Sequence, residues 1–307
     1  MRAFAILLVF VFAAQAAFAA IDSTLTSLAP SSSTLLTGID VQRAGASGSG
    51  NRMLERVIDD QGVAKLVSSI GLNLRRDLRH LLLVGVGQQP TSESQTVVIA
   101  NGTFDPARLM SAGRLRGVSV KRFSGFVAVT QGTGVTAPAV AFPRSGVLVM
   151  GNLRMVQTVL TSRAHRGNID AVLRDQVSQI GPENDVWFAT TLSGSFLADA
   201  AGDALPSQVR TSGALERISR SAGGLQFGPS DKVVLNLVAR SPTDARLLSG
   251  VLGVAATIAR LQLRGNSGLV LAETVLTSMQ LSVDDSTVHL VSTLPDAQLE
   301  RALISPN

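Results

Sequence analysis

The segment Leu81-Leu82-Leu83-Val84-Gly85-Val86 is a continuous apolar run, which is typical of a β-strand buried on both faces. After a polar loop at residues 88–94, the β-branched residues of 95–100 (Gln-Thr-Val-Val-Ile-Ala) predict its hairpin partner. Residues 104–106 (Phe-Asp-Pro) then change the period, because Asp caps a helix and Pro occupies its first turn. We expect this helix to reach about residue 115, so the order predicts a mixed α+β fold.

A second stretch of the chain repeats this order. Residues 97–99 (Val-Val-Ile) precede Asp-Pro-Ala-Arg-Leu at 105–109, and residues 233–235 (Val-Val-Leu) precede Thr-Asp-Ala-Arg-Leu at 243–247. We therefore predict two related α+β halves, residues 21–166 and 167–307. Each half is expected to be an antiparallel sheet with helices on one face, of the split β-α-β (ferredoxin-like) type.

The remaining elements are expected from alternation, helical spacing and turn residues. Further strands are predicted at 34–41, 118–123, 126–130, 139–142, 147–150, 185–190, 225–227, 232–239, 279–283 and 287–292, and helices at 52–70, 153–163, 214–221, 242–263 and 295–303.

The predicted helix at 242–263 has no charged residue between Arg246 and Arg260. A helix that is apolar nearly all round is typically buried between layers of a fold. The alternative is that it lies against a partner subunit or a membrane surface. A transmembrane span is excluded by length, because the 13 residues between the two arginines fall short of the roughly 20 that a bilayer needs.

Residues 1–20 have the layout of a cleaved secretory signal peptide. Arg2 precedes an apolar run at 3–14, and Ala17-Phe18-Ala19 fits the small-x-small rule, which places cleavage at Ala19 or Ala20. An uncleaved anchor is disfavoured, because about a dozen apolar residues are too few to span a bilayer. We therefore expect an exported protein, periplasmic or extracellular, with no transmembrane span in the mature chain.

Composition excludes several classes of protein. Of 307 residues, 45% are hydrophobic and 16% charged, with a mean hydropathy of +0.30, so the chain is too apolar to be disordered. The absence of Cys excludes disulfides, thiol catalysis, iron–sulfur clusters and Cys-ligated zinc. Loss of Arg2 leaves 26 basic against 22 acidic residues, or +4. With no Tyr and one Trp there are few stacking platforms, so we expect no nucleic-acid partner.

Catalytic and cofactor patterns are absent from the sequence. His80, His165 and His289 have no partner at metal-binding spacing. The Gly-Ala-Ser-Gly-Ser-Gly run at 45–50 is neither a nucleophile elbow nor a phosphate loop, and it is interpreted as a connector. We therefore predict no catalytic residue, no metal and no cofactor.

A cationic cluster precedes the apolar strand. Arg75, Arg76, Arg79 and His80 could together grip an anion such as a phosphate or a sugar acid. The structural alternative is that they satisfy helix-end carbonyls and pair with nearby acids. These four residues are the candidate ligand-binding group of the sequence.

Three short motifs make the chain similar to a set of uncharacterised exported bacterial proteins. They are Gly-Ile-Asp-Val at 38–41, Arg76-Asp77 ahead of the apolar strand, and Gly-x-Phe-Asp-x-x-x-Leu at 102–109. The resemblance implies an exported α+β protein and carries no functional residues, because no activity is attached to the set.

The sequence therefore favours a non-catalytic exported protein, a binding or assembly module of the bacterial envelope that acts through sheet faces or an apolar helix. Its partner would be another envelope protein or a second copy. Two alternatives stay open: a carrier of an apolar or anionic small molecule, and a periplasmic hydrolase whose acids and histidines meet only in the folded protein.

Overall fold

The computed structural model describes residues 23–59, 71–103, 105–107, 111, 119–123, 125–130, 132, 134–164, 169–201, 209, 212–263 and 275–304. The chain divides into two compact units. The N-terminal unit comprises residues 21–46 and 50–175, and the C-terminal unit comprises residues 47–49 and 176–307. The predicted division at 166/167 therefore lies nearer the N-terminus than the observed one.

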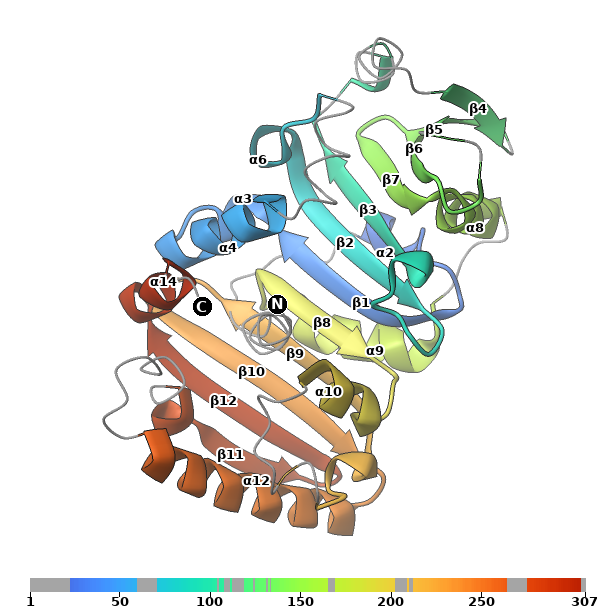
Figure 1. The fold of residues 1–307 in the computed structure, drawn as a ribbon. Coiled ribbons are helices and arrows are strands. Elements are labelled where there is room, and N and C mark those ends of the chain that lie inside the picture. The colour runs from blue at the N-terminus through green and yellow to red at the C-terminus, as the bar shows by residue number, and fades with distance from the viewer. Residues whose placement is uncertain are drawn as a thin grey trace. The chain divides into compact units, whose positions relative to one another are not determined.

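The sheet of the N-terminal unit has the strand order β1-β2-β3-β7-β6-β5-β4, and each neighbouring pair is antiparallel. Figure 1 shows these strands in blue to green. In chain order they are β1 (Ser33–Asp40), β2 (Leu78–Val86), β3 (Thr96–Gly102), β4 (Ser119–Phe123), β5 (Phe126–Thr130), β6 (Pro138–Arg144) and β7 (Val147–Asn152).

Six described helical segments accompany these strands, of which α4 and α8 are the longest with 12 residues each. They are α2 (Ser23–Thr26), α3 (Val41–Ala44), α4 (Gly48–Asp59), α6 (Leu74–Asp77), the 3-10 turn η1 (Glu93–Gln95) and α8 (Leu153–Ala164). The first two residues of α4 belong to the C-terminal unit, and α9 (Ala171–Ile180) crosses the division at 175/176.

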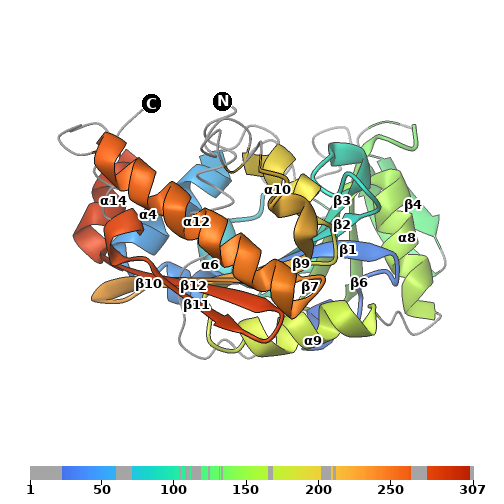
Figure 2. The same cartoon turned by 90° about the horizontal axis from the view of Figure 1, so that it is seen from below.

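The sheet of the C-terminal unit has the strand order β11-β12-β10-β9-β8, again antiparallel. Its strands are β8 (Val186–Thr190), β9 (Ile218–Gln226), β10 (Ser230–Ala239), β11 (Gln280–Asp284) and β12 (Thr287–Pro295). Its helical elements are α10 (Gly194–Ala201), the turn η3 (Leu215–Arg217), α12 (Pro242–Leu263) and α14 (Asp296–Ile304). Figure 2 shows α10, α12 and α14 on the same side of this sheet.

Cross-strand apolar columns form the core of each unit. In the N-terminal unit Leu82 faces Ile99 across β2 and β3, and Ile99 faces Val149 of β7. In the C-terminal unit Leu237 of β10 faces Val288 of β12, and buried Leu248 of α12 belongs to the same cluster. Burial of such side chains contributes about 1.5–3 kcal/mol each, which makes these columns the main source of stability.

The mixed α+β class with antiparallel strands is confirmed. In the split β-α-β arrangement the two strands joined by a helix flank a third strand. Here α10 joins β8 to β9, which are direct antiparallel neighbours. The helix α12, by contrast, joins β10 to β11, which lie on either side of β12, so this connection crosses over one strand.

One predicted helix is wrong, and two predictions lie outside the described residues. Residues 214–221, expected as a helix, form η3 and the first part of β9. The strand forms because it pairs on both sides: Ser221 to Leu225 lie opposite β8, and Ile218 lies opposite Ala239 of β10. Most of the predicted helix at 104–115 and the whole signal segment with Ala19 and Ala20 lie outside the described part of the chain.

Candidate functional site

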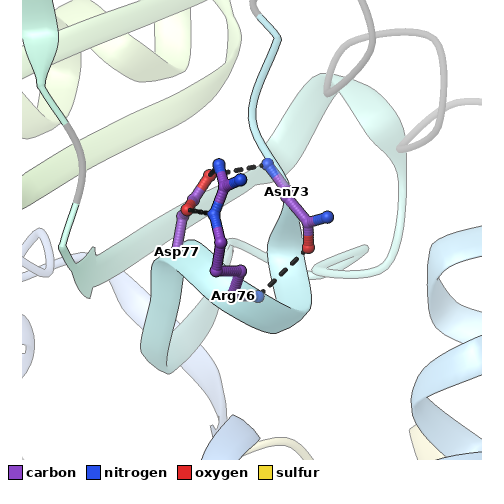
Figure 3. Close-up of polar contacts among 3 residues, drawn as sticks. All are labelled: Asn73, Arg76 and Asp77. Atoms are coloured by element: carbon purple, nitrogen blue, oxygen red, sulfur yellow. Dashed lines mark hydrogen bonds and ion pairs between the residues drawn. The ribbon is translucent and has the colours of Figure 1, made fainter.

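The predicted cationic cluster lies at the turn α6, directly before β2. Asn73 and Asp77 close this turn reciprocally, as Figure 3 shows. The Asn73 side chain accepts a hydrogen bond from the backbone N–H of Arg76 (3.1 Å), and Asp77 Oδ2 accepts from the backbone N–H of Asn73 (2.9 Å). Each side chain thus satisfies a backbone donor of a helix start, which is the physical role of a capping pair.

Arg76 is engaged by the carboxylate next to it in sequence. Its Nε donates to Asp77 Oδ1 (2.6 Å) and its Nη2 to Asp77 Oδ2 (3.0 Å). The bond to this carboxylate and its charge raise the pKa of the Arg76 guanidinium. Asp77 is buried, whereas two thirds of the Arg76 side chain is exposed. The Arg76 guanidinium, which was the candidate donor for an external anion, is therefore already bound by the Asp77 carboxylate.

Backbone contacts fix the same turn to β3. The carbonyl oxygen of Asp77 accepts from the backbone N–H of Thr103 (2.7 Å). A Cβ on Gly102 would lie only 1.9 Å from that oxygen, so glycine is required for the close approach. The Arg76–Asp77 pair is thus part of the anchor of α6 on the sheet.

The other candidate residues of the cluster point to different surroundings. Arg79 is exposed on β2, and the side chain of Arg75 lies outside the described part of the structure. His80 faces Asn101 across β2 and β3, with 3.1 Å between His80 Nδ1 and Asn101 Oδ1. The contact of His80 with Asn101 and that of Arg76 with its own neighbour in sequence thus involve different partners.

His80 instead meets an acid that sequence reasoning missed. Its Nε2 lies 3.7 Å from Oδ2 of buried Asp40, whose other oxygen caps α3 by accepting from the Arg43 N–H (3.0 Å). Burial raises the pKa of Asp40, but the contact with His80 and the Arg43 N–H outweigh it, so the net pKa is lowered. Both ring nitrogens of His80 have partners, which suits a cross-strand support better than a proton shuttle.

The second described histidine has a similar partner. His289 of β12 lies directly opposite Asn236 of β10, with 2.8 Å between His289 Nδ1 and Asn236 Oδ1. His165 lies outside the described residues. Within the described part of the chain no group of three or more His, Asp or Glu side chains is arranged to hold a metal ion.

The outer face of α12 is an exposed apolar stripe, here named the α12 stripe and defined by Leu247, Val254 and Leu261. These side chains are 50%, 61% and 63% exposed and recur every seven residues. The opposite face is buried, with Leu248 and Ala255 in the core. The prediction of a helix buried between layers is thus wrong for the outer face, because among the described residues only the sheet side of α12 is covered. Among the described helices none is long and apolar enough to cross a membrane.

Sequence reasoning also missed a pair of acids in the C-terminal unit, one of which is fully buried. Asp231, at the second position of β10, is fully buried and lies near Asp296 at the start of α14. Burial and the charge of Asp296 raise the pKa of Asp231 to about 7, against smaller opposing effects of Gly228 and Ser49. Asp231 and Asp296 are 65 residues apart in sequence, so no local sequence pattern predicts that they lie close together.

No protein-family model and no curated protein matches this chain. Among solved structures the chain is similar to TP0453 in its crystal form I, with a TM-score of 0.51 and 10% sequence identity over 94% of this chain and 100% of that chain. At this identity the likeness concerns the α+β fold alone.

Proposed function

We propose that this chain is an exported, non-catalytic binding and assembly module of the bacterial envelope, and that it associates through the α12 stripe. The observation that carries the proposal is the set of three large apolar side chains, each at least half exposed, along one helix face. Exposed apolar side chains gathered on one face are a common mark of an interaction surface.

The spacing of the α12 stripe favours a second copy of this chain as the partner. Leu247 and Leu261 lie seven residues on either side of Val254, so the stripe has nearly the same pattern in both directions. An antiparallel pair of α12 helices centred on Val254 would match leucine to leucine at both ends. A twofold interface requires this kind of self-complementary surface.

Charge and backbone access support the same pairing. In the antiparallel register Arg246 would face position 262 of the second copy and Arg260 would face position 248, and both positions are uncharged. Like charges are thus not opposed across the seam. Gly250 and Gly253 have open space where a Cβ would stand, so the two backbones could approach closely.

The test is sedimentation velocity of the mature chain and of two matched valine variants. Val254→Glu places a charge at the centre of the stripe, and Val172→Glu places one at a valine of α9 that is 38% exposed. We expect a dimer for the wild type and for Val172→Glu, and a monomer for Val254→Glu. Circular dichroism checks that both variants are folded.

Two results would overturn this proposal. One is a wild-type chain that stays monomeric up to about 100 µM, because its dimer dissociation constant would then be higher than that of a typical specific assembly. The other is a Val254→Glu variant that dimerises like the wild type. Binding of monomers to lipid vesicles through the α12 stripe would also contradict the dimer, because the partner would then be a membrane surface.

Export is proposed from the N-terminal segment. The order of Arg2, the apolar run at 3–14 and the small residues before Ala20 supports a cleaved signal peptide. N-terminal sequencing of the mature protein tests it, and a mature chain that still begins at Met1 would remove the support for an envelope role.

We also propose that the two units are related copies of one ancestral unit. The order β1-β2-β3-β7-β6 in the N-terminal unit has a counterpart in β8-β9-β10-β12-β11 of the C-terminal unit. In both, three consecutive strands are followed by a hairpin whose second strand returns to the third strand, and a helix follows (α8 or α14). On this proposal β4 and β5 are additions to the N-terminal copy.

A further inference from the structure

Two fully buried polar atoms at the start of β10 have no hydrogen bond of normal geometry, although Ser49 lies close enough to lower the pKa of Asp231. One is Oδ2 of Asp231, and the other is the hydroxyl of Ser49, in a three-residue segment (Ser47–Ser49) that belongs to the C-terminal unit. The other oxygen of Asp231 accepts only a long bond (3.4 Å) from the backbone N–H of Gly228. A buried carboxylate in such surroundings is costly, because its charge has lost water and gained little in return.

A second acid closes the same site from α14. Oδ1 of Asp296 accepts a hydrogen bond from the backbone N–H of Ser49 (3.2 Å). At Gly48 a Cβ would come within 3.0 Å of Glu300 Oε2 and 3.4 Å of Asp296 Oδ2, so the segment lies tightly against both acids. Acidic groups at this end of α4 are favoured by the exposed N–H groups of a helix start.

We propose that Asp231 holds a proton and, with Asp296 and Ser49, forms a proton-operated latch that keeps the segment Ser47–Ser49 and the start of α14 against β10. The hydroxyl of Ser49 can serve Asp231 in either protonation state, as acceptor from the carboxyl or as donor to the carboxylate, whereas only the protonated form avoids a buried charge beside Asp296. When the proton leaves, the fully buried carboxylate of Asp231 faces the partly buried carboxylate of Asp296, and the closed arrangement loses its advantage.

The charged groups around Asp231 agree with this assignment. From α14 it is faced by Asp296, with Glu300 one turn further along beside Gly48. From β12 it is faced by Leu294, which is apolar. Lys232, the next residue of β10, points to the opposite face of the sheet because side chains alternate along a strand.

The direction of the response follows from the two protonation states. Burial and Asp296 raise the pKa of Asp231 to about 7 in the closed form, whereas an opened site returns it toward the ordinary value of 3.8. The latch is therefore tightest at low pH. It loosens as the pH rises toward about 7 and changes no further above it.

The test is amide hydrogen exchange of Ser49 in the full chain, corrected for the intrinsic pH dependence of exchange. For the wild type we expect the opening constant to rise by up to about tenfold per pH unit between about pH 5 and 7 and to level off above. Asp231→Asn, which is neutral at every pH, should show a flat profile. Asp199→Asn, an exposed acid of α10, is the matched control and should behave as the wild type.

A second variant keeps the proposal testable if Asp231→Asn does not fold. Asp296→Asn can still accept from the Ser49 N–H but removes the facing charge, so the pH at which the profile levels off should fall. Infrared spectroscopy in the same pH range should detect one protonated carboxyl that Asp231→Asn lacks. A flat wild-type profile, or an Asp231→Asn profile as steep as the wild type, would overturn the latch.

Discussion

Replacing Gly102 with alanine tests whether the turn at Asp77 is clamped to β3. The new Cβ would stand 1.9 Å from the Asp77 carbonyl oxygen, a backbone atom that cannot rotate away. Strands β2 and β3 must therefore separate locally by about 1 Å in a closely packed region. This breaks the bond from the Thr103 N–H to the same oxygen. Strain should cost about 1–3 kcal/mol and the lost hydrogen bond about 1 kcal/mol. We therefore expect the free energy of unfolding to fall by about 2–4 kcal/mol.

Hydrogen exchange measured by mass spectrometry reports this loss locally, in peptides from β2 and β3. A loss of this size corresponds to exchange that is faster by roughly 30-fold or more. The matched control is Gly134→Ala, where the nearest atom would lie 3.9 Å from the new Cβ, so stability should change by less than about 0.5 kcal/mol. If Gly102→Ala cost less than about 1 kcal/mol and left β2 and β3 protected, the reasoning about the clamp would be refuted.

Two further predictions concern the C-terminal unit. In the monomeric Val254→Glu background, Leu248→Ala should cost about 3–5 kcal/mol of unfolding free energy, because Leu248 is fully buried, whereas Leu247→Ala should stay within about 0.5 kcal/mol. Urea denaturation followed by the fluorescence of buried Trp187 measures both, and equal losses would contradict the orientation of α12. Asp231→Asn should remove a pH dependence of stability. Because the folded protein keeps a proton that the unfolded chain releases, wild-type stability should fall between about pH 4 and 7. Thermal unfolding at about pH 8 should show the variant to be more stable by up to about 4 kcal/mol, and a variant less stable than the wild type there would contradict the assignment.

Strands were predicted well where burial alone determines the pattern. The apolar run beginning at Leu81 lies within β2, and its predicted partner is β3. The hairpin of β11 and β12 also forms at the expected turn, where Asp285 adopts a positive φ of 46°. Aspartate tolerates this conformation better than most residues, which explains why turn chemistry could be read from the sequence.

The wrong helix at 214–221 shows where local patterns fail. Leu215 and Ile218 have helical spacing, and Gly223 looks like a helix end. In the structure that glycine lies inside β9, and the next one, Gly224, makes room for the Asn184 side chain, which would meet a Cβ within 2 Å. Pairing with β8 therefore overrides local propensity, and no single-sequence pattern contains that information.

The candidate sites also differ in how far they could be predicted from the sequence. The Arg76–Asp77 pair joins neighbouring residues, so its structural role was open to sequence reasoning. The Asp231–Asp296 pair was not, because it depends on the register that sets Asp231 opposite Leu294 and on where α14 begins. The exposure of the α12 stripe depends on how many layers cover the helix, which composition does not reveal.

The hairpin connectivity has a consequence for how the C-terminal unit forms. Strands β8, β9 and β10 are consecutive in the chain and neighbours in the sheet, so they can assemble as they emerge during synthesis or export. Strand β12 pairs with β10 only after the 22 residues of α12 and the following hairpin have been delivered. Until then the edge of β10 is open to other chains. We expect a chaperone to matter most in the interval before β12 pairs with β10. Because the protein has no cysteine, its folding does not depend on thiol oxidation.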